Sequence, residues 1–224
     1  MKEKILSFDT KYQNVFFTSD THFWHDNIIK FCNRPFNSIE EMNDTIIENW
    51  NRVVDKNDIV FHLGDFCFCG ADKFKELVEK LNGRIYLILG NHDWKTIKNW
   101  HASKFEGVYQ QLAIKVNGKK IYLNHFPFLC YAGTHYRFED SVWQLFGHVH
   151  SSEKNKNGLD NQRLSMLFPT QYDVGVDNNN YTPVSFEQVK NIIEKQCFGK
   201  IKNIIETLFW QNKEYNRNTN TNLT

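Results

Sequence analysis

The amino-acid sequence predicts an α/β fold, and two features of the chain support this class. The first hundred residues alternate apolar runs of strand length with amphipathic segments of helical spacing. The second half adds a hairpin, further strand-like runs and a closing helix. Strands that alternate with helices are typical of βαβ units with a mostly parallel sheet. The sequence therefore predicts one α/β domain over residues 1–212.

The first half of the chain contains three expected strands and two expected helices. The strands are apolar runs that begin near Val15, Asp58 and Arg84, and each of them ends in polar residues. The helices are expected at 39–54, where apolar residues recur at helical spacing, and at 71–83, where a glycine provides the stop signal. This order of elements predicts parallel pairing of the three strands.

The second half contains a strong hairpin signal. Two alternating runs over residues 111–126 flank Asn117 and Gly118, a pair that favours the tight turn between antiparallel strands. Further strand-like runs are expected at 141–150, 171–179 and 181–186. Both hairpin strands and the later runs extend the fold beyond the first sheet.

A helix is expected to close the domain, followed by a tail. Ser185 is followed three residues later by Gln188, which is the spacing of a capping box at a helix start. The helical pattern runs to about residue 211, with an expected break near Gly199. Residues 213–224 are polar and rich in Asn and Thr, so we expect a disordered tail.

Composition and charge exclude several classes of protein. The chain has 224 residues, 41% hydrophobic residues and a formal net charge of +1, which is typical of a globular domain and disfavours a long polyanionic partner. Neither a signal-peptide pattern nor a run of about 18 apolar residues is found, so we expect a cytoplasmic protein without a membrane partner. The cysteines are odd in number and lack zinc-ribbon spacing, which favours reduced thiols.

Polar clusters follow the apolar runs at the points where strands are expected to end. In an open α/β sheet the carboxyl ends of the strands meet at one crevice, so residues distant in sequence become neighbours there. Carboxylate, imidazole and amide oxygen together suit Mn, Fe, Zn or Ni, and the set is large enough for two ions that share a carboxylate. The residues concerned are Asp20, His22, Asp65, Asn91, His92, His125, His148 and His150.

Glycines precede three of these clusters. Gly64, Gly90 and Gly147 each stand next to a candidate ligand. A glycine lets the backbone turn sharply or approach another segment closely. Three such glycines at three strand ends favour a built site over coincidence.

Each candidate ligand has a simpler explanation when taken alone. Asp20 could cap the following helix, Asp65 could be a turn residue, and Asn91 could occupy a left-handed turn. His148 and His150 alternate, so on a strand they share one face as a structural pair. The joint pattern, five clusters in order at strand ends, favours the metal site over these separate readings.

These motifs resemble the calcineurin-like metallophosphoesterase superfamily. The resemblance rests on Asp20-Thr21-His22, Gly64-Asp65, Gly90-Asn91-His92-Asp93, His125 and Gly147-His148-Val149-His150, in the family's order, over about residues 15–180. The stretch DTHFWHDNIIKFCNRPF is similar to a small prokaryotic and phage branch of predicted phosphoesterases. The resemblance implies a four-layer α-β-β-α sandwich with two mixed sheets.

The resemblance also implies roles for the ligands. Asp20, His22, Asp65 and His150 would hold one divalent ion, and Asp65, Asn91, His125 and His148 would hold a second. A hydroxide that bridges the two ions would then attack phosphorus in line. Manganese is the first choice of metal, with iron, zinc or nickel as alternatives.

Two residues beside the expected ligands are candidates for catalysis. The resemblance places His92 beside the metals as the donor of a proton to the leaving group, and Asp93 would orient it and stabilise its charge. The alternative for His92 is a hydrogen bond that only orients the phosphate.

The loop after Asp20 supplies candidate substrate contacts at His25, Asn27 and Arg34. The guanidinium of Arg34 could bind phosphate oxygens bidentately, and the alternative is a surface arginine paired with Glu40 or Glu41. For His25 the alternative is a solvated loop histidine.

The expected activity is metal-dependent hydrolysis of a small phosphomonoester or phosphodiester, with nucleotides and cyclic nucleotides among the candidate substrates. One alternative is a nuclease that acts on DNA or RNA, which the near-neutral charge disfavours. The other is a catalytically inactive metal-binding scaffold that recruits protein partners. An intact ligand set argues against the scaffold.

Overall fold

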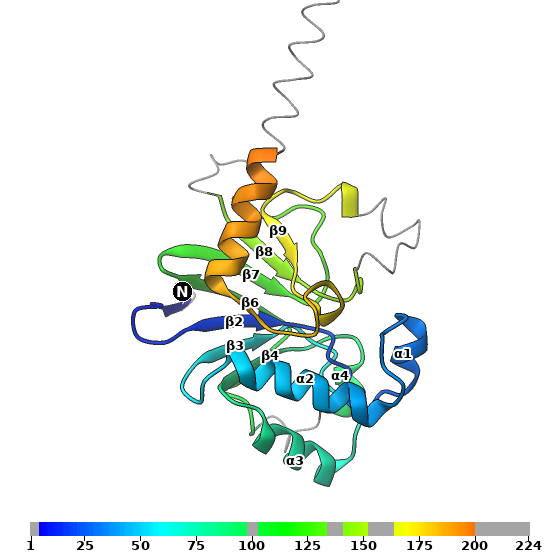
Figure 1. The fold of residues 1–224 in the computed structure, drawn as a ribbon. Helices are drawn as coiled ribbons and strands as arrows, with labels where there is room; N and C mark the ends of the chain where they lie inside the picture. The colour runs from blue at the N-terminus through cyan, green and yellow to red at the C-terminus, as the bar shows by residue number, and fades with distance from the viewer. Residues whose placement is uncertain (1–4, 98–102, 134–140, 152–163, 200–224) are drawn as a thin grey trace, which may run out of the picture.

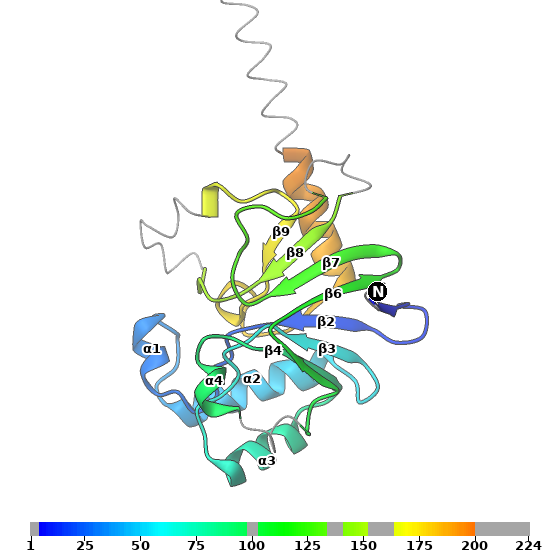
Figure 2. The same ribbon diagram turned by 180° about the vertical axis from the view of Figure 1, so that it is seen from behind.

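Two five-stranded sheets lie face to face in the computed structural model of the protein, which describes residues 5–97, 103–133, 141–151 and 164–199. The helices α2 and α3 cover the outer face of one sheet, and the helix at 186–199 lies on the other side of the molecule (Figure 1). Figure 2 shows the same layers from behind. The predicted α/β class with two mixed sheets in a sandwich is confirmed.

The sheet next to α2 and α3 is the one predicted from the first hundred residues. Its order is β10-β2-β3-β4-β5; β2 to β5 pair in parallel, and β10 is antiparallel to β2. The strands are β2 (Val15–Thr18), β3 (Ile59–His62), β4 (Arg84–Ile88), β5 (Gly107–Tyr109) and β10 (Val184–Ser185). The short strand β5 is an addition that the sequence did not predict.

The second sheet has the order β1-β6-β7-β8-β9 and mixes parallel with antiparallel pairs. Its strands are β1 (Leu6–Phe8), β6 (Gln111–Val116), β7 (Lys119–Asn124), β8 (Trp143–Phe146) and β9 (Gln171–Asp173). The predicted hairpin is formed by β6 and β7, and both turn residues are left-handed, with φ of 50° at Asn117 and 80° at Gly118. That conformation is the one an Asn-Gly hairpin turn requires.

The helices predicted at 39–54 and 71–83 begin at the predicted residues, whereas two short helices, α1 and α4, were not predicted. The described α-helices with complete bounds are α1 (Asn27–Phe31), α2 (Ile39–Val53), α3 (Ala71–Lys80) and α4 (Asp93–Thr96), and a short 3-10 turn η2 covers Val176–Asn178. Ser185 and Gln188 form the expected capping box, with Gln188 Oε1 accepting from Ser185 N at 2.8 Å. The continuation of this helix beyond 199 and the tail at 213–224 lie outside the described residues.

The hydrophobic core has two parts, one on each face of the β2–β5 sheet. Side chains of alternate strand residues, such as Phe17 and Phe61, meet the second sheet and the helix at 186–199. The other face, with Phe16 and Val60, packs against α2 and α3. Because β2, β3 and β4 are covered on both faces, polar groups that follow them emerge only at the strand ends. No helix in the described part of the chain is both long and apolar enough to cross a bilayer.

Candidate metal centre

The loops that follow β2 and β3 are joined by backbone hydrogen bonds. The N–H of Asp20 donates to the carbonyl of Gly64 at 2.9 Å, and the N–H of His22 donates to the carbonyl of Asp65 at 3.0 Å. These bonds continue the parallel pairing beyond the sheet and place two predicted ligand motifs side by side.

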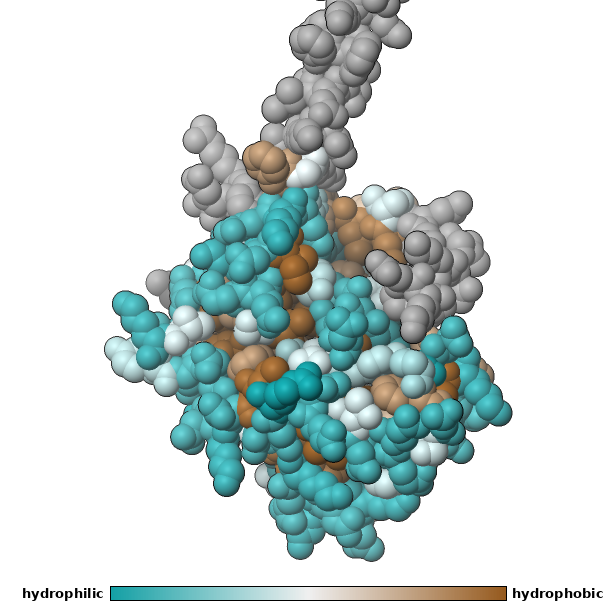
Figure 3. Space-filling view, in the orientation of Figure 1, coloured by the Kyte–Doolittle hydropathy of each residue, from teal (hydrophilic) through white to brown (hydrophobic). Residues whose placement is uncertain are grey.

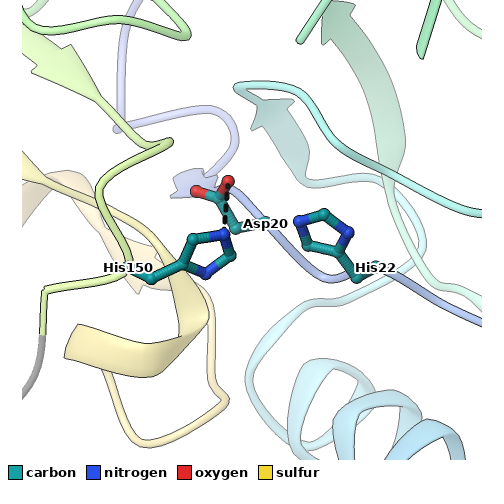
Figure 4. Close-up of side chains that lie close together, drawn as sticks. All are labelled: Asp20, His22 and His150. Atoms are coloured by element: carbon teal, nitrogen blue, oxygen red, sulfur yellow. Dashed lines mark ion pairs between the residues drawn. The ribbon is translucent and has the colours of Figure 1, made fainter. Parts of the chain in front are cut away.

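One group of potential ligands consists of Asp20, His22 and His150. Their donor atoms all lie within 4.8 Å of one another. Asp20 and His22 come from the end of β2, and His150 approaches from the loop after β8 (Figure 4). The Nε2 atom of His150 lies 3.8 Å from Asp20 Oδ1. The structure thus brings together residues that are about 130 positions apart in the chain.

The second group consists of Asp65, His125 and His148, whose donor atoms also lie within 4.8 Å of one another. Asn91, from the end of β4, joins this group because its Oδ1 atom lies 3.0 Å from His125 Nε2. The structure therefore brings the expected ligand residues together in two groups.

Asp65 lies between the two groups. Its Oδ2 atom is 3.6 Å from His22 Nε2 in the first group and 3.5 Å from His125 Nε2 in the second. Donor atoms that bind one ion at about 2.0–2.2 Å each lie roughly 3–4 Å apart. Both distances suit a carboxylate shared by two ions.

The imidazoles fit a metal because their other nitrogens are already bonded. His125 Nδ1 lies 2.8 Å from the carbonyl of Leu63, and His150 Nδ1 lies 2.8 Å from Asp177 Oδ2. Such partners fix the tautomer and direct Nε2 toward an ion. His22 Nε2 is buried and has no hydrogen-bond partner among the described residues, a cost that metal coordination would remove.

Charge supports the same assignment. Burial and the neighbouring His150 lower the pKa of His22 well below its usual value, so this imidazole is neutral and ready to bind. Burial also lowers the pKa of His150, but Asp20 and Asp177 outweigh it and raise the pKa to about 11. Burial acts against protonation of His125 too, yet Asp65 and Asp20 raise its pKa to about 9. An ion would replace the protons on His125 and His150.

The backbone is strained at the candidate ligands. Positive φ angles are found at Asp20 (59°), His22 (49°), Asp65 (55°), His148 (71°) and His150 (46°). Residues other than glycine adopt this left-handed region at a cost, and such residues cluster at functional sites. The fold holds these five side chains in place at the expense of backbone strain.

Close packing requires all three predicted glycines, and a Cβ atom at Gly64 would collide with the backbone of Gly90 and the ring of His125. A Cβ atom at Gly90 would collide with the carboxylate and backbone of Asp65. A Cβ atom at Gly147 would collide with the side chains of Ser19 and Asp20. The three glycines therefore leave room for the candidate ligands Asp65, Asp20 and His125.

Asp93 makes contacts that its predicted role beside His92 did not include. It is fully buried, and its carboxylate accepts the backbone N–H groups of Asp65 (2.8 Å), Phe66 (2.9 Å) and Gly90 (2.8 Å). These contacts tie the loop after β3 to the loop after β4. Asp93 therefore positions the loops that carry Asp65 and Asn91.

The assignment of Arg34 to substrate binding is wrong. Its guanidinium is fully buried and donates to both carboxylate oxygens of Asp177, to the carbonyls of Asp20 and Thr21, and to the sulfur of Met42. These contacts use the donor groups that a phosphate would need. The alternative of a surface ion pair with an acidic residue of α2 is wrong as well, because Arg34 lies under the metal centre.

The remaining candidates lie at the edge of the site. The His92 side chain is 45% exposed, and its Nε2 atom lies 4.0 Å from Asp65 Oδ2. His25 is half-buried; its Nδ1 atom lies 3.1 Å from His22 Nδ1, and its ring stacks on Phe68 with centroids 4.0 Å apart. His25 thus supports a candidate ligand, while Asn27 is exposed at the start of α1.

The sequence analysis missed two residues of the site, Asp177 and Cys32. Together with His150 they form a third compact group of potential ligand atoms, and Asp177 connects His150 to Arg34. A signal for Asp177 was present, because it follows Gly175 after an apolar run, as the other motifs follow their glycines. Cys32 gives no comparable signal in the sequence.

Comparison with known proteins identifies the class to which this fold and site belong. Residues 14–187 match the family described as Calcineurin-like phosphoesterase, and the chain belongs to that family. The family implies metal-dependent hydrolysis of phosphoesters.

Relatives are found in archaea and phages. An uncharacterized protein of Methanocaldococcus jannaschii is 38% identical over 198 residues, which is 88% of this chain and 98% of that protein. The Gene 66 protein of Mycobacterium phage L5 is 31% identical over 169 residues, which is 62% of this chain and 78% of the phage protein. A solved structure of a protein of unknown function from Aquifex aeolicus is similar, with 27% identity and a TM-score of 0.60, over 80% of this chain and 99% of that one.

Proposed function

We propose that this protein is a phosphoesterase with two divalent ions that hydrolyses a small phosphomonoester or phosphodiester. The observation that carries the proposal is the position of Asp65 between the two ligand groups, within 3.6 Å of each. Manganese is the favoured metal, since imidazole, carboxylate and amide oxygen suit it.

The proposed ligands divide as the two groups do. Asp20, His22 and His150 hold the first ion, and Asn91, His125 and His148 hold the second, with Asp65 shared between them. When bound, two such ions lower the pKa of a coordinated water and stabilise the oxygens around phosphorus. The protein fixes the donor atoms beforehand through buried hydrogen bonds and a strained backbone.

His92 is the proposed proton donor to the leaving oxygen. Its backbone N–H donates to Asp65 Oδ1 at 2.9 Å, which anchors the residue beside the shared carboxylate. Its ring is partly exposed, so it can reach a substrate that the buried ligands cannot. A donor in this position would supply the proton that an alkoxide needs on departure.

The cysteines fit a reducing compartment, and we place the protein in the cytoplasm. No disulfide joins the cysteines in the described part of the chain, and Cys130 is exposed. Disulfides are rare in the cytosol, where thiols stay reduced. The proposed partner is a small phosphate ester rather than a nucleic acid.

The test is hydrolysis after metal reconstitution. Protein stripped with a chelator is reloaded with Mn²⁺ and assayed on aryl monoesters and diesters, cyclic nucleotides and short oligonucleotides. Turnover of a small ester that needs Mn²⁺ supports the proposal. A preference for oligonucleotides would favour the nuclease, and two bound ions without any turnover would favour the scaffold.

A further inference from the structure

An apolar cavity of about 400 Å³ opens beside the candidate metal centre. Its wall contains one candidate metal ligand, His148, which is exposed. Ligand sites for small molecules typically occupy about 300–1,000 Å³, so the cavity is large enough for the organic part of a phosphate ester. The lining residues are Phe126, Pro127, Phe128, Leu129, His148, Val149, Leu164, Met166 and Leu167.

Phe126 connects the cavity to the metal ligands. Its ring lies edge-on to His148, with centroids 4.7 Å apart, and edge-on to His125, with centroids 5.0 Å apart. The ring is 45% exposed, although it is a large apolar side chain. A group that enters the cavity therefore lies against His148, a proposed ligand of the second ion, and against Phe126, whose ring packs on His125.

The wall of the cavity is held in place by polar side chains, of which Gln144 and Gln171 are buried. Asn124 Oδ1 accepts the N–H of Phe126 at 2.8 Å, and Gln171 Nε2 donates to the carbonyl of Phe128 at 2.9 Å. Gln144 Oε1 accepts the N–H of Phe128 at 3.3 Å. These bonds fix the loop after β7, so the cavity is already formed before a ligand binds.

The chemistry of the wall selects an apolar occupant. Among the described residues that line the cavity, no side chain is a carboxylate, an ammonium or a guanidinium, which disfavours a second phosphate or a polyanion. Apart from His148, these described side chains offer no hydrogen bond to the polar edges of a nucleobase, and such edges are costly to bury without partners. Figure 3 shows that this face is mostly hydrophilic, with apolar side chains gathered in a few patches, one of them beside the short turn at 164–165.

We propose that this cavity binds an uncharged, apolar organic group of the substrate, with an aromatic ring as the best fit, while the phosphate lies at the metal centre. The inference rests on the proposed function and deepens it. Aromatic rings pack favourably against Phe side chains edge-to-face and against the sulfur of Met166. The substrate class is thus an aryl or similarly apolar phosphate ester rather than a nucleotide.

The test compares three phosphonates that differ in the organic group and contain a stable carbon–phosphorus bond. Phenylphosphonate, methylphosphonate and a nonhydrolysable nucleoside 5′-phosphonate are titrated calorimetrically into Mn²⁺-loaded protein. We expect phenylphosphonate to bind at least about tenfold more tightly than methylphosphonate, the scale of discrimination in an apolar pocket. Binding reports on the cavity even if no ester is turned over, so failure of this inference is distinguishable from failure of the proposed function.

A pair of variants locates the preference. Met166→Glu places a carboxylate in the cavity at a side chain that is 64% exposed, and we expect it to remove most of the preference for phenylphosphonate. Tyr12→Glu places the same charge at an exposed residue in the loop between β1 and β2 and should leave the preference unchanged.

Three binding results would overturn the inference. They are equal or undetectable binding of phenyl- and methylphosphonate, tighter binding of the nucleoside phosphonate, and a preference for phenylphosphonate that persists in Met166→Glu. A wild-type dimer in sedimentation that Met166→Glu dissociates would also overturn it, because the cavity would then be assigned to a second copy of the chain.

Discussion

Arg34 and Asp177 form a buried, bidentate ion pair, with both N–H···O distances at 2.8 Å. Asp177 Oδ2 also lies 2.8 Å from His150 Nδ1, so the pair supports a candidate ligand of the first ion. Burial alone would raise the pKa of Asp177, but Arg34 and His150 outweigh it and lower the pKa, which keeps the carboxylate ionised. The orientation of His150 therefore depends on an arginine 116 positions earlier in the chain.

Arg34→Lys tests this dependence. Lysine keeps the charge but loses the planar fork, so Asp177 is held less firmly and His150 loses its fixed orientation. Loss of an outer partner of a metal ligand typically costs about 10–100-fold in metal affinity, and we expect a loss of that size. The measurement is a calorimetric titration of metal-free protein with Mn²⁺.

The matched control is Arg84→Lys. Arg84 and Glu106 form an ion pair with the same 2.8 Å distance, but both side chains are exposed, 46% and 38%. Exposed pairs contribute little, so metal affinity and stability should stay close to wild type. If Arg34→Lys bound Mn²⁺ as tightly as Arg84→Lys, the pair would have no part in positioning His150.

Asp65→Asn tests the shared carboxylate. The amide keeps the shape but removes the negative charge between the two ions, so they repel and one of them is lost. We expect hydrolysis to fall at least about a hundredfold and the metal content to drop from two ions toward one. Metal analysis and the rate are measured on the same reconstituted sample.

Asp58→Asn is the control for general damage. Asp58 is also buried and accepts backbone N–H groups from Asn14 and Asp55, but it lies at the opposite end of β3. Asp58→Asn should lower the free energy of unfolding without changing the metal content. Two bound ions and near wild-type activity in Asp65→Asn would contradict the dinuclear site.

The motifs and much of the fold were predictable, because each signal lies within a few residues. The Asn-Gly turn and the Ser185 capping box are examples of features set by local backbone geometry. The short strands β1 and β5 were not predictable, because three residues carry too little periodicity and pair only when a neighbouring strand is present.

The roles of Arg34 and Asp93 could not be read from the sequence for a different reason. Both are charged residues, which are usually exposed, and the sequence therefore favoured a substrate contact for Arg34 and the orientation of His92 for Asp93. In the fold both are buried by partners far along the chain, Asp177 for one and the backbone of Asp65 for the other. Only the tertiary arrangement reveals that their hydrogen bonds are used within the protein.

Gly90→Ala tests the close approach of the loop after β4 to Asp65. The added Cβ would collide with the Asp65 carboxylate and backbone, so the carboxylate must move. We expect weaker Mn²⁺ binding and slower hydrolysis.

Gly70→Ala is the control, because nothing lies within 4 Å of a Cβ atom at Gly70. Gly70 is the N-cap of α3, and its replacement by alanine should lower the free energy of unfolding by no more than about 1 kcal/mol. Unchanged metal affinity in Gly90→Ala would show that the loop after β4 can move away from Asp65 without disturbing the site.

The stability of the metal-free protein should fall as the pH rises above neutrality. The folded pKa values of His125 and His150, about 9 and about 11, lie above the unfolded value of about 6.5. Their contribution is therefore complete below pH 6.5 and is lost as the pH rises through the folded values. His22, whose folded pKa is lowered, is neutral in the fold over this range, and it adds a slope only near pH 6.5, where its unfolded form loses the proton.

Metal-loaded protein should lack this decline, because bound ions require neutral imidazoles and replace the protons. Thermal unfolding is measured between pH 6.5 and 9 with and without Mn²⁺. A flat melting temperature for the metal-free protein would show that these two imidazoles are not protonated in the fold.

His92→Ala tests the proposed proton donor, and its effect should depend on the leaving group. An alkoxide departs poorly without a proton, whereas a nitrophenolate departs as the anion, so only the first needs a general acid. General acids contribute about 10²–10⁴-fold, and we expect a loss of that size on an alkyl ester and a small loss on the matching aryl ester. Because the His92 side chain is partly exposed, its replacement by alanine leaves no cavity in the hydrophobic core.

The control is Trp94→Ala, a change at another exposed side chain two residues later, which should reduce hydrolysis of both esters equally and slightly. Both esters are measured on one metal-loaded preparation of each variant. Equal losses on the two esters in His92→Ala would mean that the imidazole orients the phosphate, and a loss of bound metal would mean that it is a ligand.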